Sequence, residues 1–405
     1  DQAWTVGDSS GGFTYSYEIP VQPPFAGTAP EGGLLYSSQS IDGMNFATNS
    51  QASAVGLGWD VPQAYIERSF KSCRDDGGAV DDLCWFTDGT GTFDHMSISL
   101  NGVSDQIRWT GGSFQITGDP VWRVEQRYGA PHQKGTNFSN PAEHGEFWVV
   151  TMKDGTEYWF GYDLGDQHSA WTVPVIGNHP SEPCYQAGDC DQVYKFLLDR
   201  VVDTNGNTIL YNYDTEINKY AYKTLVYSPR DYVSGGTLSK IVYGIHDTDL
   251  SDNSAPTSGL AEVVFNTQYR CGTLDSTCPV PTSSSSAQFP DVPVDLICQG
   301  PPCSKTSPSF FGVKRLASVD SRVWNGGWVT TDRVTLAHVF PYANPVEAGV
   351  SPRLFLQGVQ RTVYPDGPGT FNLPSNFFAP TSASWLASRT YPNPGGGIPA
   401  TMLPR

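Results

Sequence analysis

The sequence predicts an all-β protein. It holds 42 glycines and 31 prolines among 405 residues. Together they make up about 18% of the chain, whereas these two residues contribute roughly 12% to an average protein. This excess excludes a helix bundle or a coiled coil. Apolar residues alternate with polar ones in many segments, and no helical periodicity extends beyond about two turns. The 11 Trp, 20 Tyr and 20 Phe indicate a packed chain, because disordered chains lack such residues.

The first strand signal lies near the N-terminus. Residues 13–19 (FTYSYEI) place aromatic or aliphatic side chains at alternate positions, which is the period of a half-buried strand. Gly32-Gly33 follows as a turn signal, and residues 34–36 predict a second strand.

Two hairpins are predicted in the middle of the chain. Asp154-Gly155 separates strand-like runs at 146–152 and 156–160, and Asn205-Gly206 separates runs at 196–202 and 208–213. Both dipeptides favour type I′ turns, which need positive φ angles. Later strands are predicted at 238–243, 260–266, 328–340 and 353–364.

Long loops separate some of these strands, and we expect them at 131–146, 163–192, 246–258 and 271–312. Residues 271–312 form an insertion rich in Cys, Pro and Ser. No linker divides the chain into parts of different composition, so residues 1–405 are predicted to form one all-β unit. No exact short repeat is present, which disfavours a propeller of matched blades.

The charge balance excludes some partners. Lys and Arg number 24 against 41 Asp and Glu, a net charge of −17. Nucleic-acid binding needs a basic footprint, and anionic membrane surfaces also attract basic segments. No run approaches the roughly 18 apolar residues of a membrane-spanning helix. We therefore expect neither a nucleic-acid partner nor a membrane span.

The eight cysteines fall in close pairs, which favours four small-loop disulfides. The pairs are Cys73 and Cys84, Cys184 and Cys190, Cys271 and Cys278, and Cys298 and Cys303. A nested pairing within the last four also stays open, whereas their spacing fits structural zinc poorly. Disulfides are typical of oxidising compartments, and a chain that starts at Asp1 is what signal cleavage would leave. Both features predict a secreted, extracellular protein.

Several short motifs resemble parts of functional sites but also fit ordinary structural roles. Residues 7–12 (GDSSGG) resemble the nucleophile loop of trypsin-like proteases, but that family places its His and Asp before the Ser. A flexible lead-in to the first strand is favoured. Asp203-x-Asn205-x-Asn207 alternates oxygen ligands as a calcium loop does, but Asp214 stands where the final Glu belongs, so a hairpin turn is favoured.

Other polar clusters could bind metal or transfer protons. Residues 246–252 (HDTDLSD) could bind calcium, although a solvated acidic loop is favoured. Glu143-His144-Gly145-Glu146 could offer metal ligands or acid and base groups, but an exposed polar loop is favoured. No His-Glu-x-x-His zinc motif or phosphate loop is present. We therefore predict no catalytic, cofactor-binding or metal-binding residue, and calcium is the cofactor that stays open.

Paired carboxylates are the strongest catalytic option, because glycosidases hold two carboxyl groups roughly 5–10 Å apart. The candidates are Asp75, Asp76, Asp81, Asp82, Glu143, Glu146 and Asp166. A sugar platform could use aromatic side chains, and the candidates are Trp85, Trp109, Trp122, Trp148, Trp159 and Trp171. Such residues more often fill a core or a cross-strand position. Asn137-Phe138-Ser139 is a glycosylation sequon.

Several segments together resemble a known family. They are residues 12–21 (GFTYSYEIPV), Pro23-Pro24, 33–40 (GLLYSSQS), 56–60 (GLGWD) and 65–68 (YIER). Their order resembles the N-terminal region of SpvB-type and insecticidal toxin-complex B-component proteins, which belong with the RHS/YD-repeat proteins. Later blocks extend the resemblance over about residues 10–380, at 154–158, 196–213, 238–241, 353–359 and 373–378. Residues 10–70 are its most specific part.

The resemblance implies an extended, spiralling antiparallel sheet with long insertions, with a β-propeller or β-sandwich as the alternative. It implies a non-catalytic scaffold or binding protein like the opening part of a toxin shell, although no array of Tyr-Asp repeats is present. The partner would be the remainder of the shell, another protein subunit or surface polysaccharide. A secreted carbohydrate-active hydrolase and a lectin-like adhesive module are the alternative functions.

Overall fold

The structure is a computed structural model that describes the residues at 5–6, 12–24, 26–41, 44, 51–78, 80–86, 95–131, 145–165, 167–180, 182–185, 190–250, 261–341, 352–365 and 369–378. Within these ranges the regular elements are strands and short 3-10 helices, so the predicted all-β class is confirmed. None of the described helices is long and apolar enough to cross a bilayer.

A small sheet is formed by the N-terminal part of the chain. Its strands, in hydrogen-bonded order, are β1 (Thr5–Val6), β2 (Phe13–Glu18), β3 (Gly33–Ser37) and β4 (Trp59–Asp60). In β2 the predicted alternation is confirmed, because Tyr15 and Tyr17 are buried while Ser16 and Glu18 are exposed.

A second group of strands closes into an antiparallel ring. Each strand pairs with the next and the last returns to the first. In ring order the strands are β5 (Tyr65–Ser72), β7 (His95–Leu100), β8 (Val103–Trp109), β9 (Phe114–Ile116), β10 (Asp119–Arg127), β11 (Phe147–Thr151), β12 (Glu157–Phe160) and β14 (Asp191–Val202). Ile66, Ile98, Trp148, Phe160 and Phe196 pack together in one cluster, so the ring encloses a packed core.

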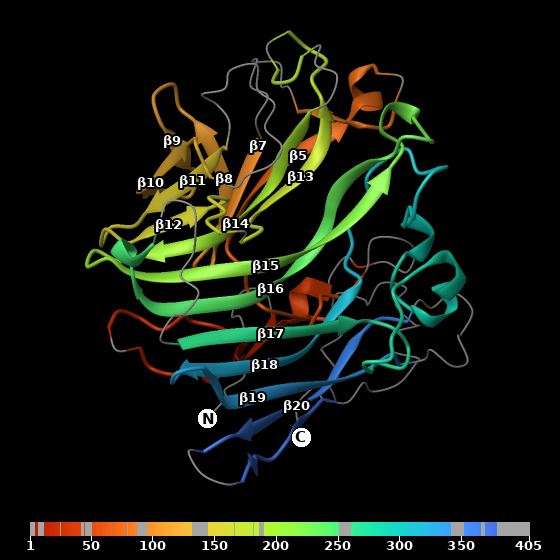
Figure 1. Cartoon of the computed structure of the whole chain (residues 1–405). Helices are drawn as coiled ribbons and strands as arrows, with labels where there is room; N and C mark the ends of the chain where they lie inside the picture. Colours follow the sequence, from red (N-terminus) through yellow and green to blue (C-terminus); the bar gives the residue numbers. More distant parts are fainter. Residues whose placement is uncertain are drawn as a thin grey trace.

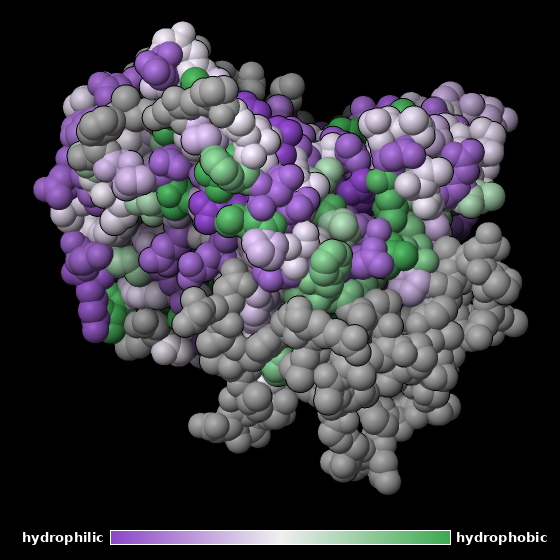
Figure 2. All heavy atoms as spheres, turned by 90° about the horizontal axis from the view of Figure 1, so that it is seen from below, coloured by the Kyte–Doolittle hydropathy of each residue, from purple (hydrophilic) through white to green (hydrophobic). Residues whose placement is uncertain are grey.

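The chain continues from the other edge of β14 as a long sheet. Its strands are β13 (Ala170–Ile176), β15 (Asn207–Tyr220), β16 (Arg230–His246), β17 (Ala261–Tyr269), β18 (Lys314–Trp324), β19 (Trp328–Val339) and β20 (Phe355–Val363), followed by the short β21 (Phe371–Asn372) and β22 (Asn376–Phe377). Figure 1 shows β15 to β19 running side by side. Polar side chains dominate the described surface on the face that Figure 2 shows.

The main core lies between the N-terminal sheet and the long sheet. Trp59 and Tyr15 from the small sheet belong to the same buried cluster as Tyr243, Val263 and Leu356 from the long one. The last described residue also packs here, since the Trp59 and Phe378 rings lie 4.8 Å apart.

The predicted hairpins are present, but their predicted turn type is wrong. Gly155 and Gly206 have φ angles of 88° and 82°, whereas neither Asp154 nor Asn205 is left-handed. A type I′ turn needs two positive φ angles, so these loops instead follow the pattern of a type I turn with one left-handed glycine. The amides of Gly155 and Gly206 donate to the carbonyls of Met152 and Asp203.

The structure also corrects two predicted features of the sheet and loops. The predicted loop 163–192 contains the strand β13. β13 pairs in parallel with β6 (Leu83–Trp85), through Val175 opposite Leu83, so the sheet is not antiparallel throughout. In contrast, 271–312 contains only short 3-10 helices, and Phe289, Val294 and Phe311 form a local cluster there.

The cysteines form four local disulfides, without nesting. Their Cα atoms lie 4.9 Å apart in Cys73–Cys84, 5.9 Å in Cys184–Cys190, and 5.7 Å in both Cys271–Cys278 and Cys298–Cys303. Each bridge closes a short loop, so it fixes a connection between strands rather than replacing the apolar core.

A buried ion pair lies beside the core of the ring. Arg68 Nη2 is 2.7 Å from Glu146 Oε1, and the side chains are 2% and 0% exposed. The same carboxylate accepts hydrogen bonds from Gln126 Nε2 and Trp148 Nε1. The pair therefore joins β5 to the residue that precedes β11.

We expect Arg68→Leu to lower the free energy of unfolding by about 3–5 kcal/mol, because the Glu146 carboxylate would stay buried without its guanidinium. Urea unfolding followed by tryptophan fluorescence measures the change. Arg74→Leu is the control, since Arg74 pairs with Asp81 at the exposed surface and such pairs contribute little. Equal unfolding midpoints for the two variants would contradict a structural role for the buried pair.

A second prediction concerns Asp199 on β14, which is fully buried. Burial raises its pKa to about 7, although Ser169 Oγ and the Asp163 amide donate to it. The folded protein therefore retains this proton longer than the unfolded chain, so stability is lost as the pH rises from about 4 to about 7. Asp199→Asn cannot ionise, and thermal unfolding across this range should show a flatter pH dependence. Parallel pH curves for the variant and the unchanged protein would contradict this expectation.

Candidate functional site

Most of the described candidate carboxylates have structural partners. Asp81 pairs with Arg74, and Glu146 pairs with Arg68. Asp82 is buried and accepts the Lys223 amide at 3.1 Å. Asp75 lies in the 3-10 helix η2 (Cys73–Asp76), while Glu143 and Asp166 lie outside the described residues.

The candidate tryptophans do not gather as a set into the sugar platform that was considered as an alternative to a core role. Trp85, Trp148 and Trp171 are buried in three different clusters. Trp109 is exposed, with its ring centroid 4.9 Å from that of Phe114. The structure therefore gives three of these side chains the core role that sequence reasoning considered more common.

In the first calcium candidate, the Asp203 carboxylate accepts hydrogen bonds from residues of the same turn. Asp203 Oδ1 accepts the amides of Asn205 and Asn207, and Oδ2 accepts Asn207 Nδ2. These contacts support the hairpin interpretation. In the second candidate, His246 caps the 3-10 helix η5 (Asp247–Asp249), and residues 251–252 lie outside the described ranges. Gly7 to Gly11, the 137–139 sequon and His144 also lie outside them.

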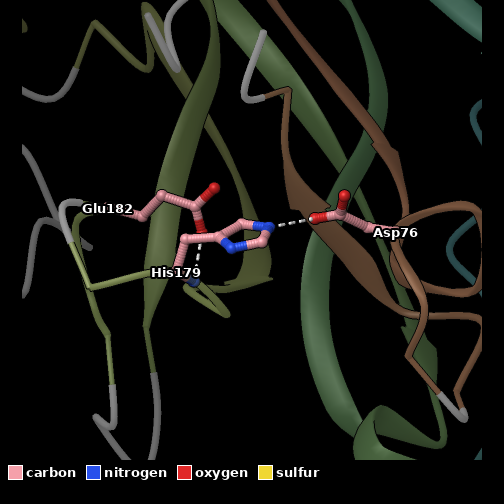
Figure 3. Close-up of side chains that lie close together, drawn as sticks. All are labelled: Asp76, His179 and Glu182. Atoms are coloured by element: carbon pink, nitrogen blue, oxygen red, sulfur yellow. Dashed lines mark hydrogen bonds and ion pairs between the residues drawn. The ribbon is translucent and has the colours of Figure 1, made fainter. Parts of the chain in front are cut away.

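One cluster of possible metal ligands does form, from Asp76, His179 and Glu182 (Figure 3). His179 Nε2 lies 3.0 Å from Asp76 Oδ2. One ligand atom from each residue lies within 4.8 Å of the others. Glu182 Oε2 accepts the amides of Asn178 and His179, so its carboxylate is held beside the imidazole.

Asp76 has further partners that set its protonation. Lys71 Nζ lies 2.6 Å from its Oδ1, and Asn178 Nδ2 lies 2.8 Å from its Oδ2. Burial opposes ionisation, but the hydrogen bonds from Lys71, Asn178 and His179 together hold the pKa of Asp76 below its ordinary value. The carboxylate is therefore ionised near neutral pH.

Sequence reasoning identified Asp76 but missed His179 and Glu182. Both lie between β13 and β14, more than a hundred residues after Asp76 in the chain. The only available signal was the two predicted disulfides, since Asp76 lies between Cys73 and Cys84 and Glu182 lies two residues before Cys184. Nothing in the sequence indicated that these loops meet, since that depends on the pairing of β6 with β13.

A second group of charged and aromatic side chains follows one row across three strands. Lys195 on β14 lies opposite Glu67 on β5 and opposite Trp171 on β13. Its Nζ is 4.2 Å from the centre of the Tyr65 ring and 5.7 Å from that of Trp171. Asp60 on β4 also interacts electrostatically with this ammonium.

The surroundings of Asp60 change its acidity. Asp60 is exposed to solvent, yet desolvation by the protein atoms around its carboxyl group raises the pKa to about 6, against the opposing effects of the Val61 amide and Lys195. A carboxyl group with such a pKa can donate a proton near neutral pH. Asp60 and Glu67 were not among the candidate carboxylates, although both lie in segments that carried the family resemblance, 56–60 and 65–68.

No protein-family model and no curated protein matches this chain, but solved structures do. The crystal structure of TcdB2-TccC3 has 18% sequence identity, a TM-score of 0.52, and a match over 93% of this chain and 16% of that chain. TcdB2-TccC3-TEV has 18% identity, a TM-score of 0.50 and the same coverage. The N-terminal domain of effector protein SpvB from Salmonella typhimurium strain LT2 has 14% identity over 86% of this chain and 100% of that one, with a TM-score of 0.43.

At these identities the likeness concerns the fold. The chain spans about 16% of the length of the first two structures, so it corresponds to one segment of a much longer polypeptide. The predicted resemblance to toxin-complex proteins is thereby confirmed for the fold: this chain has the fold of a segment of the TcdB2-TccC3 toxin complex.

Proposed function

We propose that this chain is a non-catalytic wall segment of a larger, secreted β-shell that assembles with another protein segment or subunit. The observation that carries the proposal is the shared fold, which includes 93% of this chain but 16% of the toxin chain. A chain that matches one stretch of a longer shell is expected to act as part of such a shell. The four disulfides support an oxidising, extracellular setting.

The long strands of the sheet are consistent with a role as part of a shell wall. β14, β15, β16 and β19 contain 12, 14, 17 and 12 residues, whereas strands in globular proteins are most often about 5–6 residues long. Hydrogen bonding along such strands makes a wide sheet, and closing or covering its edges prevents unwanted association.

The partner surface that we propose lies beside β20, the last long strand. Phe371, Leu373 and Phe377 are exposed on the short ribbon that pairs with β20. Apolar side chains gathered on one exposed ribbon are typical of a protein interface. The occupant that fits best is an adjoining segment of the shell, since the ribbon lies where the sheet would continue.

This surface can be tested by complex formation with the shell segment or subunit encoded together with the chain. We expect Phe377→Asp to weaken that complex at least tenfold, because it places a charge in an apolar contact. Val280→Asp is the matched control, since Val280 and Phe377 are both 60% exposed but Val280 lies in the 271–312 insertion. Isothermal titration calorimetry gives both affinities. Equal affinities for the two variants would remove this surface from the proposal.

A secreted carbohydrate-active hydrolase is the second candidate. The observation that favours it is the group of Asp60, Glu67 and Lys195 beside Tyr65 and Trp171, with the pKa of Asp60 raised to about 6. One carboxyl group that retains its proton and a second nearby carboxylate are the parts that glycoside hydrolysis requires.

The two candidates predict different results with aryl glycosides and soluble polysaccharides. The shell proposal predicts no turnover by the purified chain. The hydrolase candidate predicts turnover that Asp60→Asn lowers by about 10²–10⁴-fold, the usual contribution of a general acid. Asp214→Asn, which changes a half-exposed carboxylate on β15, should leave any turnover unchanged. Turnover that survives Asp60→Asn would exclude Asp60 as the acid.

A further inference from the structure

Two connections between strands, each with a disulfide, meet beside the ring. The first connects β5 to β6 and is closed by Cys73–Cys84. The second connects β13 to β14 and contains Cys184, which pairs with Cys190. The parallel pairing of β6 with β13, with Cys84 opposite Ile176, holds the loops together, and Trp85 Nε1 donates across them to the Pro183 carbonyl.

Each loop supplies metal-binding groups to the space between them. Asp76 comes from the first loop, while His179 and Glu182 come from the second (Figure 3). The tight turn of the second loop is fixed by the Glu182 amide, which donates to the His179 carbonyl, and by the Glu182 carboxylate, which accepts two amides in return. The three donors are therefore held by backbone structure on both sides.

We propose that Asp76, His179 and Glu182 bind one zinc ion, which joins the two loops. An imidazole nitrogen with two carboxylate oxygens is a donor set that suits zinc, whereas calcium prefers oxygen donors alone. Three protein ligands with a water molecule complete the usual four-coordinate arrangement. The proposal is independent of the shell function, because it concerns only these two loops.

The separations fit zinc after a small movement. Metal–ligand distances of about 2.0–2.2 Å place neighbouring donors of a tetrahedral site about 3.4 Å apart. Asp76 Oδ2 and His179 Nε2 are already 3.0 Å apart, and the three donor atoms lie within 4.8 Å of one another. The His179 side chain is 45% exposed, so its ring is not held by close packing on every side.

Asn178 provides a second, independent observation. Its Oδ1 is buried and has no hydrogen-bond partner, although its Nδ2 lies 2.8 Å from Asp76 Oδ2. The protein therefore leaves one buried acceptor unsatisfied directly beside the proposed ligands, on a side chain whose other end already contacts Asp76.

The positive charge of Lys71 would weaken zinc binding, and this effect can be tested. Its ammonium is bound to Asp76 Oδ1 at 2.6 Å, which leaves Oδ2 for the metal but places a positive charge near it. Removing this charge strengthens zinc binding, because like charges close together repel. The site therefore predicts opposite effects for two substitutions, a loss of affinity for His179→Ala and a gain for Lys71→Gln.

The experiment uses the full chain with its disulfides intact, freed of metal with a chelator and titrated with zinc chloride by isothermal titration calorimetry. We expect one zinc ion per chain. His179→Ala should weaken that binding at least a hundredfold, and Lys71→Gln should tighten it about tenfold. Zinc should raise the melting temperature of the unchanged protein, because the ion binds the folded state, and it should have no such effect on His179→Ala. Calcium chloride should neither bind at this stoichiometry nor displace zinc.

His246→Ala is the matched control. His246 is also 45% exposed, and its Nδ1 lies 3.0 Å from Asp247 Oδ1, so it repeats the imidazole–carboxylate contact away from the proposed site. This variant should bind zinc as the unchanged protein does. The proposal is overturned if no stoichiometric binding occurs, if His246→Ala abolishes binding, or if His179→Ala binds zinc unchanged. Equal melting temperatures of both variants without metal show that neither loss arises from unfolding.

Discussion

The hydrogen bonding of β14 is the constraint on which the rest of the structure depends. The N-terminal half of this strand bonds to β5 on one edge and β13 on the other, and its C-terminal half bonds to β12 and β15. Its side chains are divided in the same way, since Phe196 packs inside the ring while Leu197 belongs to the main core. The ring and the long sheet therefore share one strand and cannot separate without losing it.

The two clusters of polar side chains follow from this arrangement. Lys195 meets Glu67 and Trp171 because the strands on either side of β14 place them in one row. Asp76 meets His179 because β13, held by β14, pairs with β6. In both cases residues that are distant in the chain come together through backbone pairing, which fixes their positions more firmly than side-chain contacts alone.

The curvature of the long sheet has a local cause. Its strand pairs contain register shifts. For example, Ser239 of β16 is an extra residue opposite Asn212 and Tyr213 of β15, and Thr331 of β19 is an extra residue opposite Ser321 and Arg322 of β18. Each extra residue bends its strand and increases the local twist. Such bends allow strands of more than ten residues to wrap over the N-terminal sheet and bury Trp59 and Tyr15. A curved sheet with a covered inner face is the property that the proposed shell requires.

The sequence by itself determined the all-β class, the hairpins at Gly155 and Gly206 and the resemblance in fold, and it favoured the local pairing of the cysteines. These features depend on neighbouring residues: a strand has a two-residue period, a turn needs a glycine with positive φ, and a short loop brings two cysteines together. Alternation also showed which side chains of β2 are buried.

Only the tertiary structure decided which strand edges meet. The alternation along β5 and β14 is the same whether these strands pair with each other or with different strands, so the closure of the ring has no local signal. No local sequence pattern predicts the parallel pairing of β6 with β13. The cluster of Asp76, His179 and Glu182 depends on that pairing, so it could not be predicted either. Long-range pairing is selected by the burial of a whole core, which is a property of the folded chain and not of any one segment.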